Sequence, residues 1–293
     1  MLHIYLVLFT VVLYSVASII RKKVSAVDDD LNYIFSVVFQ LLGGVSVFLF
    51  SILLGFGNEY SQFFPTLNSS IAIKIFIGSI LWFLSTVTSF KALNKITASK
   101  YSIIETLAPL VSIVLALSFL GESFNQTQFV GMILILISVF MVIYDKNDNF
   151  SHFSKGEFIA LLSAILAGVA LVNDKGIYAV TPLSPTLVVL FILPGILGIL
   201  AKPSELKKLH LIIKNKNVIK QLLIMSTIWG IAAISYYKAI VISNSISLVV
   251  SVGQLSTVMT VLLGLIVLKE RENWQLKIIA SVVSVVGLVF MSL

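Results

Sequence analysis

The sequence predicts an all-α integral membrane protein in which ten transmembrane helices form two inverted five-helix repeats. Three observations carry this prediction: few charges, long apolar runs and an internal repeat. Of the 293 residues, 58% are hydrophobic and only 11% are charged, a balance that a soluble core of this length does not need. Apolar runs of about 18 residues or more can cross ~30 Å of hydrocarbon as helices, whereas the strands of a membrane β-barrel are shorter and alternate in period two.

Ten apolar segments have the length and composition of membrane spans. The first is expected to be a retained helix, not a signal peptide, because no basic n-region precedes it. Residues 94–99, 121–125 and 243–244 leave room only for tight turns between antiparallel helices. The predicted spans are residues 3–20, 33–56, 71–93, 100–120, 126–144, 157–180, 185–201, 219–242, 245–268 and 274–292.

Basic residues gather on one side of these predicted spans. The loops after the odd-numbered spans, with their flanks, hold residues 21–23 and most of the other lysines and arginines, whereas the loops on the opposite side hold only Lys74. The positive-inside rule places the basic side in the cytoplasm, so an even number of spans places both termini outside. Membrane topology therefore explains the formal charge of +7, and we expect no nucleic-acid partner.

Two stretches of the chain repeat the same pattern of polar and aromatic residues. Trp82 precedes Lys91 by nine residues, and Trp229 precedes Lys238 by nine. Each lysine is followed by alanine and then by leucine or isoleucine. The first and sixth predicted spans end in the related strings "ASIIRKK" and "ALVNDKG". The chain therefore reads as two copies of one five-helix unit.

The two copies cover residues 1–145 and 157–293 and together form one membrane domain. Because five is odd, the second copy must enter the membrane upside down relative to the first. Inverted repeats of this kind are typical of secondary transporters, whose substrate site lies near the midplane between the halves.

Several motifs resemble a known family over essentially the whole chain. They are the hairpin "FKALNKITAS", Pro109 in "LAPLVSIVLAL", and the "LGE" that closes the fourth span. Together they resemble the EamA-type branch of the drug/metabolite transporter superfamily. Two departures are Thr257, where the first half has Pro109, and Lys269-Glu270 in place of Gly-Glu.

The resemblance implies a transporter of the cell (inner) membrane, without enzymatic activity or cofactor. It also implies a cavity lined mainly by spans one, three, four, six, eight and nine, which favours Tyr14 over Gln40 as a site residue. Relatives are described with cytoplasmic termini, which opposes the orientation that the charge pattern indicates.

Four polar residues inside the predicted spans are the first candidates for the site. Lys91 and Glu105 lie about equally far from the 94–99 hairpin, and Lys238 and Gln254 lie equally far from the second hairpin. An ionised side chain inside a span costs roughly 2.5–3.5 kcal/mol, so we expect Lys91 and Glu105 to face the interior and to pair. The alternative is that Lys91 and Glu105 both lie within two turns of the membrane surface and snorkel to it.

Aromatic and polar residues near the same depth complete the candidate set. Trp229 and Tyr237, with Trp82 as the counterpart in the first half, form either an aromatic pocket or an interfacial belt. Asn173 and Asp174 interrupt the sixth span and are either a gate or a hydrated helix end.

The function prediction is a secondary transporter of a small organic metabolite that works by alternating access. Two buried lysines favour an amino-acid-like or other polar or anionic solute, and Glu105 is a candidate carrier of a coupling proton. One chain suffices for the pathway, and membrane lipids and the solute are the expected partners. The alternative is a lipid or polyprenyl-phosphate flippase that uses the basic loop around residues 202–220. The chain has no cysteine and no cluster with metal-ligand spacing, so we expect no metal site and no enzyme.

Overall fold

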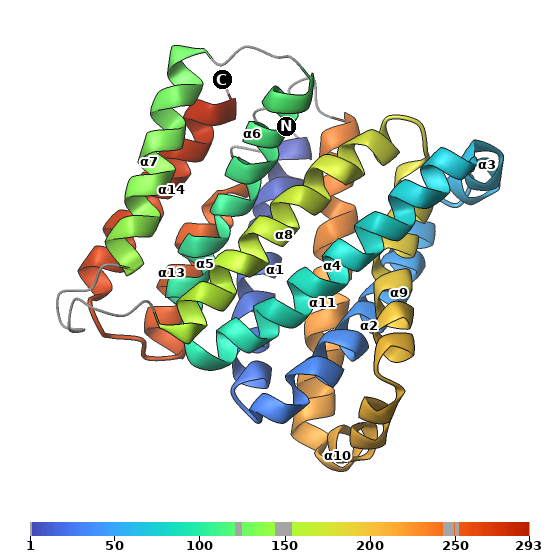
Figure 1. Ribbon diagram of the computed structural model, residues 1–293, viewed down its shortest axis with the longest axis horizontal. Helices are drawn as coiled ribbons and strands as arrows, with labels where there is room; N and C mark the ends of the chain where they lie inside the picture. The colour runs from blue at the N-terminus through green and yellow to red at the C-terminus, as the bar shows by residue number, and fades with distance from the viewer. Residues whose placement is uncertain (1, 121–124, 144–153, 243–248, 250–251, 293) are drawn as a thin grey trace.

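The computed structural model describes residues 2–120, 125–143, 154–242, 249 and 252–292, and this part of the chain is helical (Figure 1). The helices that form the bundle in the first half are α1 (Leu2–Ser25), α2 (Asn32–Leu53), α4 (Ser69–Lys95), α5 (Ala98–Glu105), α6 (Leu107–Leu120) and α7 (Gln126–Ile143). Those of the second half are α8 (Lys155–Tyr178), α9 (Leu183–Ala201), α11 (Lys216–Ile242), α13 (Leu255–Val267) and α14 (Trp274–Ser292). Short elements connect them: η1 (Asp29–Leu31), α3 (Glu59–Thr66), η2 (Pro203–Lys208) and α10 (Leu209–Lys214).

The structure confirms an all-α protein that crosses the membrane several times. Within the described residues, eight helices are long and apolar enough to be spans, namely α1, α2, α4, α7, α8, α9, α11 and α14. The expected count of ten continuous spans is therefore not reproduced. The ninth expected span, residues 245–268, lies partly outside the described residues, as do the expected turns at 121–125 and 243–244.

The expected span at residues 100–120 is the clearest correction, because it is two helices. α5 ends at Glu105 and α6 begins at Leu107. Pro109 has no backbone N–H, and its ring collides with the carbonyl group four residues earlier in a continuous helix, which is that of Glu105. The proline that marks the motif therefore accounts for the break. It leaves Glu105 at a helix end beside the interior of the protein.

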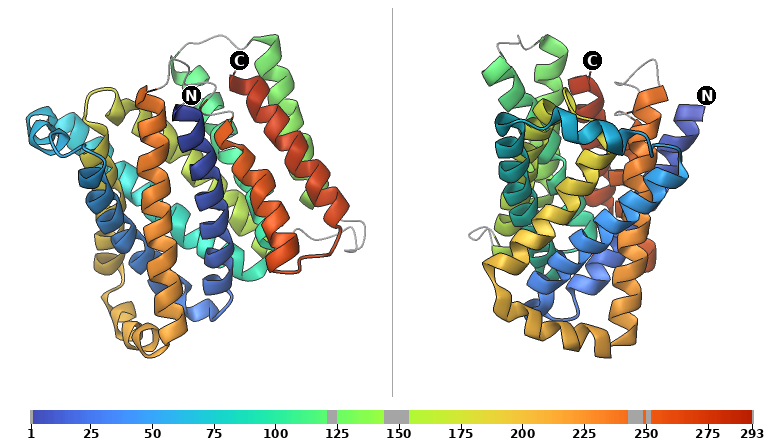
Figure 2. Two further views of the ribbon diagram at one scale, coloured as in Figure 1. Left: turned by 180° about the vertical axis from the view of Figure 1, so that it is seen from behind. Right: turned by 90° about the vertical axis from the view of Figure 1, so that its right-hand side faces the viewer.

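Helices from the two halves pack against each other in matching pairs. α1 packs on α11 as α8 packs on α4, while α2 pairs with α9 and α7 pairs with α14. Figures 1 and 2 show α7 and α14 side by side at one flank of the molecule and α2 and α9 toward the other. The four helices α1, α4, α8 and α11 lie between these flanks, and both chain ends lie at the same edge.

Close approach of α7 and α14 depends on a pair of glycines. A Cβ atom on Gly131 would lie 2.5 Å from the carbonyl oxygen of Gly287, and a Cβ on Gly287 would lie 2.8 Å from the carbonyl oxygen of Gly131. Small residues let membrane helices approach until their backbones touch, which strengthens their dispersion contacts. This pair fixes one flank of the bundle, so the central helices have a stable neighbour.

Candidate functional site

Two adjoining cavities lie in the middle of the bundle. The first has a volume of about 280 Å³ and is lined by residues of α1, α2, α4, α5, α8, α9 and α11. The second has a volume of about 330 Å³ and extends toward α6 and α13. The residues that line both are Tyr14, Trp82, Glu105, Leu171 and Trp229. Both halves of the chain therefore contribute to one central chamber.

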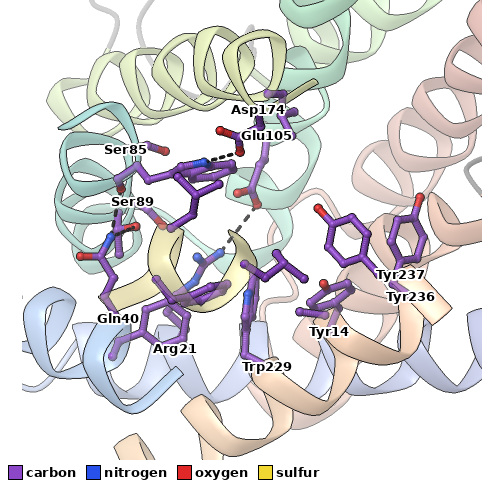
Figure 3. A pocket seen from close by; sticks show the side chains of 18 of the residues that line it. Tyr14, Arg21, Gln40, Ser85, Ser89, Glu105, Asp174, Trp229, Tyr236 and Tyr237 are labelled. Atoms are coloured by element: carbon purple, nitrogen blue, oxygen red, sulfur yellow. Dashed lines mark hydrogen bonds and ion pairs between the residues drawn. The ribbon is translucent and has the colours of Figure 1, made fainter. Parts of the chain in front are cut away.

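Arg21 of α1 is the cation of this chamber. It is only 4% exposed, and its Nη2 lies 3.6 Å from Oε2 of Glu105 (Figure 3). Its guanidinium carbon lies 5.2 Å from the ring centroid of Trp229 and 5.3 Å from that of Tyr101. The Tyr101 hydroxyl donates to Oε1 of Glu105 at 3.2 Å. A planar guanidinium between two rings and a carboxylate is held by several weak contacts at once.

Asp174 of α8 is held by a different contact. Nε1 of Trp82 donates a hydrogen bond to its Oδ2 at 2.7 Å, as the dashed line in Figure 3 shows. The residue is 4% exposed. Its other oxygen, Oδ1, has no hydrogen-bond partner of ordinary geometry among the described residues, since the amide of neighbouring Asn173 donates to the carbonyl oxygen of Lys74 at 2.9 Å.

A third polar group of the wall is the amide of Gln40. Its Nε2 donates to Oγ1 of Thr86 at 3.0 Å and to the carbonyl oxygen of Trp82 at 3.2 Å, whereas its Oε1 is buried without a partner. Nε of Arg21 and Oδ1 of Asp174 are also buried and unpartnered in the described part of the chain. Buried polar atoms are normally hydrogen-bonded, so three unpartnered atoms around one cavity indicate a place where a bound molecule or water completes the bonding.

Most of the residues expected from the sequence meet at this chamber. Tyr14, Trp82, Glu105, Asp174, Trp229 and Tyr237 line the first cavity. Gln254 lines the second cavity, together with Glu105. Asn173 lines neither cavity; its side chain instead ties α8 to α4 through the carbonyl oxygen of Lys74.

The two lysines among the candidate site residues, Lys91 and Lys238, line neither cavity. The expected interior position of Lys91 and its pairing with Glu105 are wrong, because Lys91 is exposed on α4 and Glu105 pairs with Arg21. Lys91 lies about one turn before the end of its helix, so its long side chain reaches the surface. Nζ of Lys238 donates to the carbonyl oxygen of Leu54 at 3.0 Å and lies 5.5 Å from the ring centroid of Phe56.

Arg21 was not among the residues predicted for the site, and Gln40 was expected to be a weaker candidate than Tyr14. Arg21 lies at the end of the first predicted span, where a basic residue reads as part of the cytoplasmic flank. The available signal was the repeat itself, because Arg21 in "ASIIRKK" and Asp174 in "ALVNDKG" occupy the same position. No group of three or more His, Asp or Glu side chains able to hold a metal ion occurs among the described residues.

Comparison with known proteins gives a family and a fold. Residues 1–144 match the model of the EamA-like transporter family. None of the curated proteins matches the chain significantly. A solved structure titled only "Crystal structure of protein" resembles it over 97% of this chain and 95% of its own, with a TM-score of 0.58 and 13% sequence identity. At this identity the likeness shows the fold alone, and it extends over both halves.

Proposed function

Because this chain belongs to the EamA-like transporter family through its residues 1–144, we propose that it is a secondary transporter that moves a small organic metabolite by alternating access. Family membership makes it a membrane transporter of small solutes and not an enzyme. The observation that carries the finer proposal is the central chamber, which is enclosed by helices of both halves. All of its walls come from one chain, so one protomer suffices for the pathway.

Reciprocal contacts support two inverted repeats, residues 1–145 and 157–293. Oγ of Ser163 on α8 donates to the carbonyl oxygen of Ser85 on α4 at 3.0 Å. Oγ1 of Thr10 on α1 is within 3.4 Å of the carbonyl oxygen of Ala232 on α11. Thr10 and Ser163 occupy matching places in the repeat, as do Ser85 and Ala232, and α1 and α8 run in opposite directions (Figure 1). An inverted duplication predicts such exchanged partners.

On the basic side of the molecule, polar contacts join the two halves of the chain. The carboxylate of Glu270, which follows α13, accepts the backbone N–H of Ala98 at 2.7 Å and of Ser99 at 3.0 Å. Both donors belong to the first turn of α5, where N–H groups have no partner within the helix. Lys100 also pairs with Glu157 of the second half. Alternating access requires these contacts, which we name the Glu270 latch, to open while the opposite side closes.

Transport is tested with the purified chain in proteoliposomes. A thermal-shift screen of metabolites grouped by charge first finds a stabilising solute, and counterflow of that labelled solute then measures exchange. We expect saturable counterflow. Stabilisation without any counterflow would indicate a receptor. Movement of head-group-labelled lipid in place of the solute would favour the flippase, for which a lateral opening near residues 202–220 is required.

Glu105 is the proposed carrier of a coupling proton. It lines both cavities, and Arg21 and Tyr101 hold its two oxygens, so a protonation change there alters contacts on α1 and α5 together. We expect Glu105→Gln to abolish uptake driven by a pH gradient and to retain counterflow, which needs no gradient. Unchanged pH-driven uptake would remove Glu105 from the mechanism.

The basis for an anionic solute is weaker than the sequence suggested. That preference depended on Lys91 and Lys238 facing the site, and neither of them lines the chamber. The charged side chains of the first cavity are instead Arg21, Glu105 and Asp174. The class of solute therefore depends on these three groups.

A further inference from the structure

We propose that the transported solute carries a positively charged nitrogen and that Asp174, together with aromatic side chains of the same cavity, binds this solute. The proposal rests on the transport function proposed above and names the class of its solute. It rests on the charges that face the cavity, on the surroundings of Asp174 and on the rings that share the wall.

The charges of the first cavity favour a cation. Its lining contains two carboxyl groups, those of Glu105 and Asp174, and the guanidinium of Arg21; no lysine is part of it. Arg21 lies 3.6 Å from Glu105, so these two charges offset each other. The carboxylate of Asp174 remains without a cation, because it forms no ion pair with any residue of the described chain.

Burial makes a missing countercharge costly at Asp174. The residue is 4% exposed, and among the described residues the hydrogen bond from Trp82 is the one of ordinary geometry that reaches its carboxylate. A buried carboxylate is favourable only when it is paired and well hydrogen-bonded. The ammonium of a solute would supply both the opposite charge and up to three N–H donors.

Aromatic rings complete the environment of a cation site. Tyr178 and Tyr237 line the cavity with ring centroids 5.7 Å apart, and Tyr236 lies 6.1 Å from Tyr237. Figure 3 shows Tyr14, Tyr236 and Tyr237 grouped at one side of the labelled charged residues. The faces of such rings attract cations and not anions. The volume of about 280 Å³ fits a solute of the size of a single substituted aromatic ring.

Three ligands of one size and different charge test the site. They are 2-phenylethylamine, which is cationic, phenylalanine, which is zwitterionic, and 3-phenylpropionate, which is anionic. Binding is measured by calorimetry and thermal shift on the purified full chain, without transport. We expect the amine and the amino acid to bind, and the carboxylate to bind at least about ten-fold more weakly, a difference of ~1.4 kcal/mol.

Two variants test whether Asp174 causes the preference for the amine over the carboxylate. Asp174→Asn should weaken the binding of 2-phenylethylamine at least ten-fold and remove its advantage over 3-phenylpropionate. The matched control is Asp29→Asn, which removes an exposed carboxylate that pairs with Lys95 at 2.8 Å outside the chamber; it should leave both affinities unchanged. The comparison of the three ligands on the unaltered protein stands even if Asp174→Asn fails to fold.

Each other result decides against the proposal or against transport. Equal binding of 3-phenylpropionate and the amine overturns the cation site, and so does unchanged amine affinity in Asp174→Asn. Binding of none of the three ligands overturns it as well, because each is smaller than the cavity. Selective binding of the amine with no counterflow in proteoliposomes leaves the cation site standing and overturns the transport function.

Discussion

Two matching positions of the proposed repeat, Arg21 and Asp174, carry opposite charges, and each side chain contacts a tryptophan. On α1, Arg21 lies over the ring of Trp229, with 5.2 Å between the guanidinium carbon and the ring centroid. On α8, Asp174 accepts the indole N–H of Trp82 at 2.7 Å. Trp82 and Trp229 are themselves repeat partners. In the proposed repeat, each half thus supplies a charged group and a tryptophan, while the sign of the charge, and with it the chemistry, differs between the halves.

The largest expected effect concerns two corresponding helix contacts, that of α8 on α6 and that of α1 on α13. A Cβ on Gly168 would lie 2.6 Å from the carbonyl oxygen of Ala108, whereas Ser15, its repeat partner, already has a side chain that donates to the carbonyl oxygen of Ser256 at 3.1 Å. We expect Gly168→Leu to cost about 3 kcal/mol or more through overpacking. Ser15→Ala should cost only about 1 kcal/mol. Thermal unfolding in detergent compares the two, and equal shifts would contradict the assigned difference.

The second expected effect concerns the charged pair of α1. Arg21→Met removes the cation from between Trp229 and Tyr101 and leaves Glu105 without its partner. We expect counterflow to fall more than ten-fold, with a loss of about 1–3 kcal/mol in stability because Glu105 remains partly hydrated. Arg21→Lys keeps the charge but loses the planar contact with the rings, so it should recover part of the activity. If Arg21→Met has the same counterflow activity as the unaltered chain, Arg21 has no role in transport.

A smaller effect distinguishes the two edges of the molecule. Glu270 caps α5 on the basic side, and Glu59 accepts the N–H of Ser184 at the start of α9 at 2.8 Å on the other side. Each carboxylate joins the two halves at a helix N-terminus, a contact worth about 1 kcal/mol. Glu270→Gln should therefore shift the balance toward opening of the basic side about five-fold.

The chain has no cysteine, so a single introduced thiol reports that opening. Ser102 lines the second cavity one turn beyond the Glu270 latch, and Ser102→Cys can be labelled with a membrane-impermeant maleimide. Glu270→Gln should speed labelling from the basic side about five-fold, and Glu59→Gln should not. The same labelling rate in both variants would show that the Glu270 latch does not gate the chamber.

The sequence alone predicts the helical architecture and names many of the residues that line the chamber. The helical fold follows from the apolar length of the segments, and the pairing of tryptophans and the interior position expected for Glu105 follow from the repeat and from the cost of burying a charge. For Asp174 and Tyr237, which line the first cavity, the sequence leaves open a hydrated helix end and an interfacial belt, respectively. The rotation of each helix about its axis does not follow from depth in the membrane. Lys91 therefore lies on the exposed face of α4, although its neighbours Phe90 and Ala92 are buried.

The smallest expected effects lie at the two lysines. Lys91→Met removes a charge that the exposed face of α4 presents away from the chamber, so both counterflow and stability should stay within two-fold and about 0.5 kcal/mol of the unaltered chain. Lys238→Met loses a hydrogen bond to Leu54 and the contact with Phe56, which should cost about 1 kcal/mol without changing solute selectivity. Because charge attracts an anionic solute only where the solute can approach it, loss of selectivity in either variant would place that lysine in the pathway and restore the case for an anion.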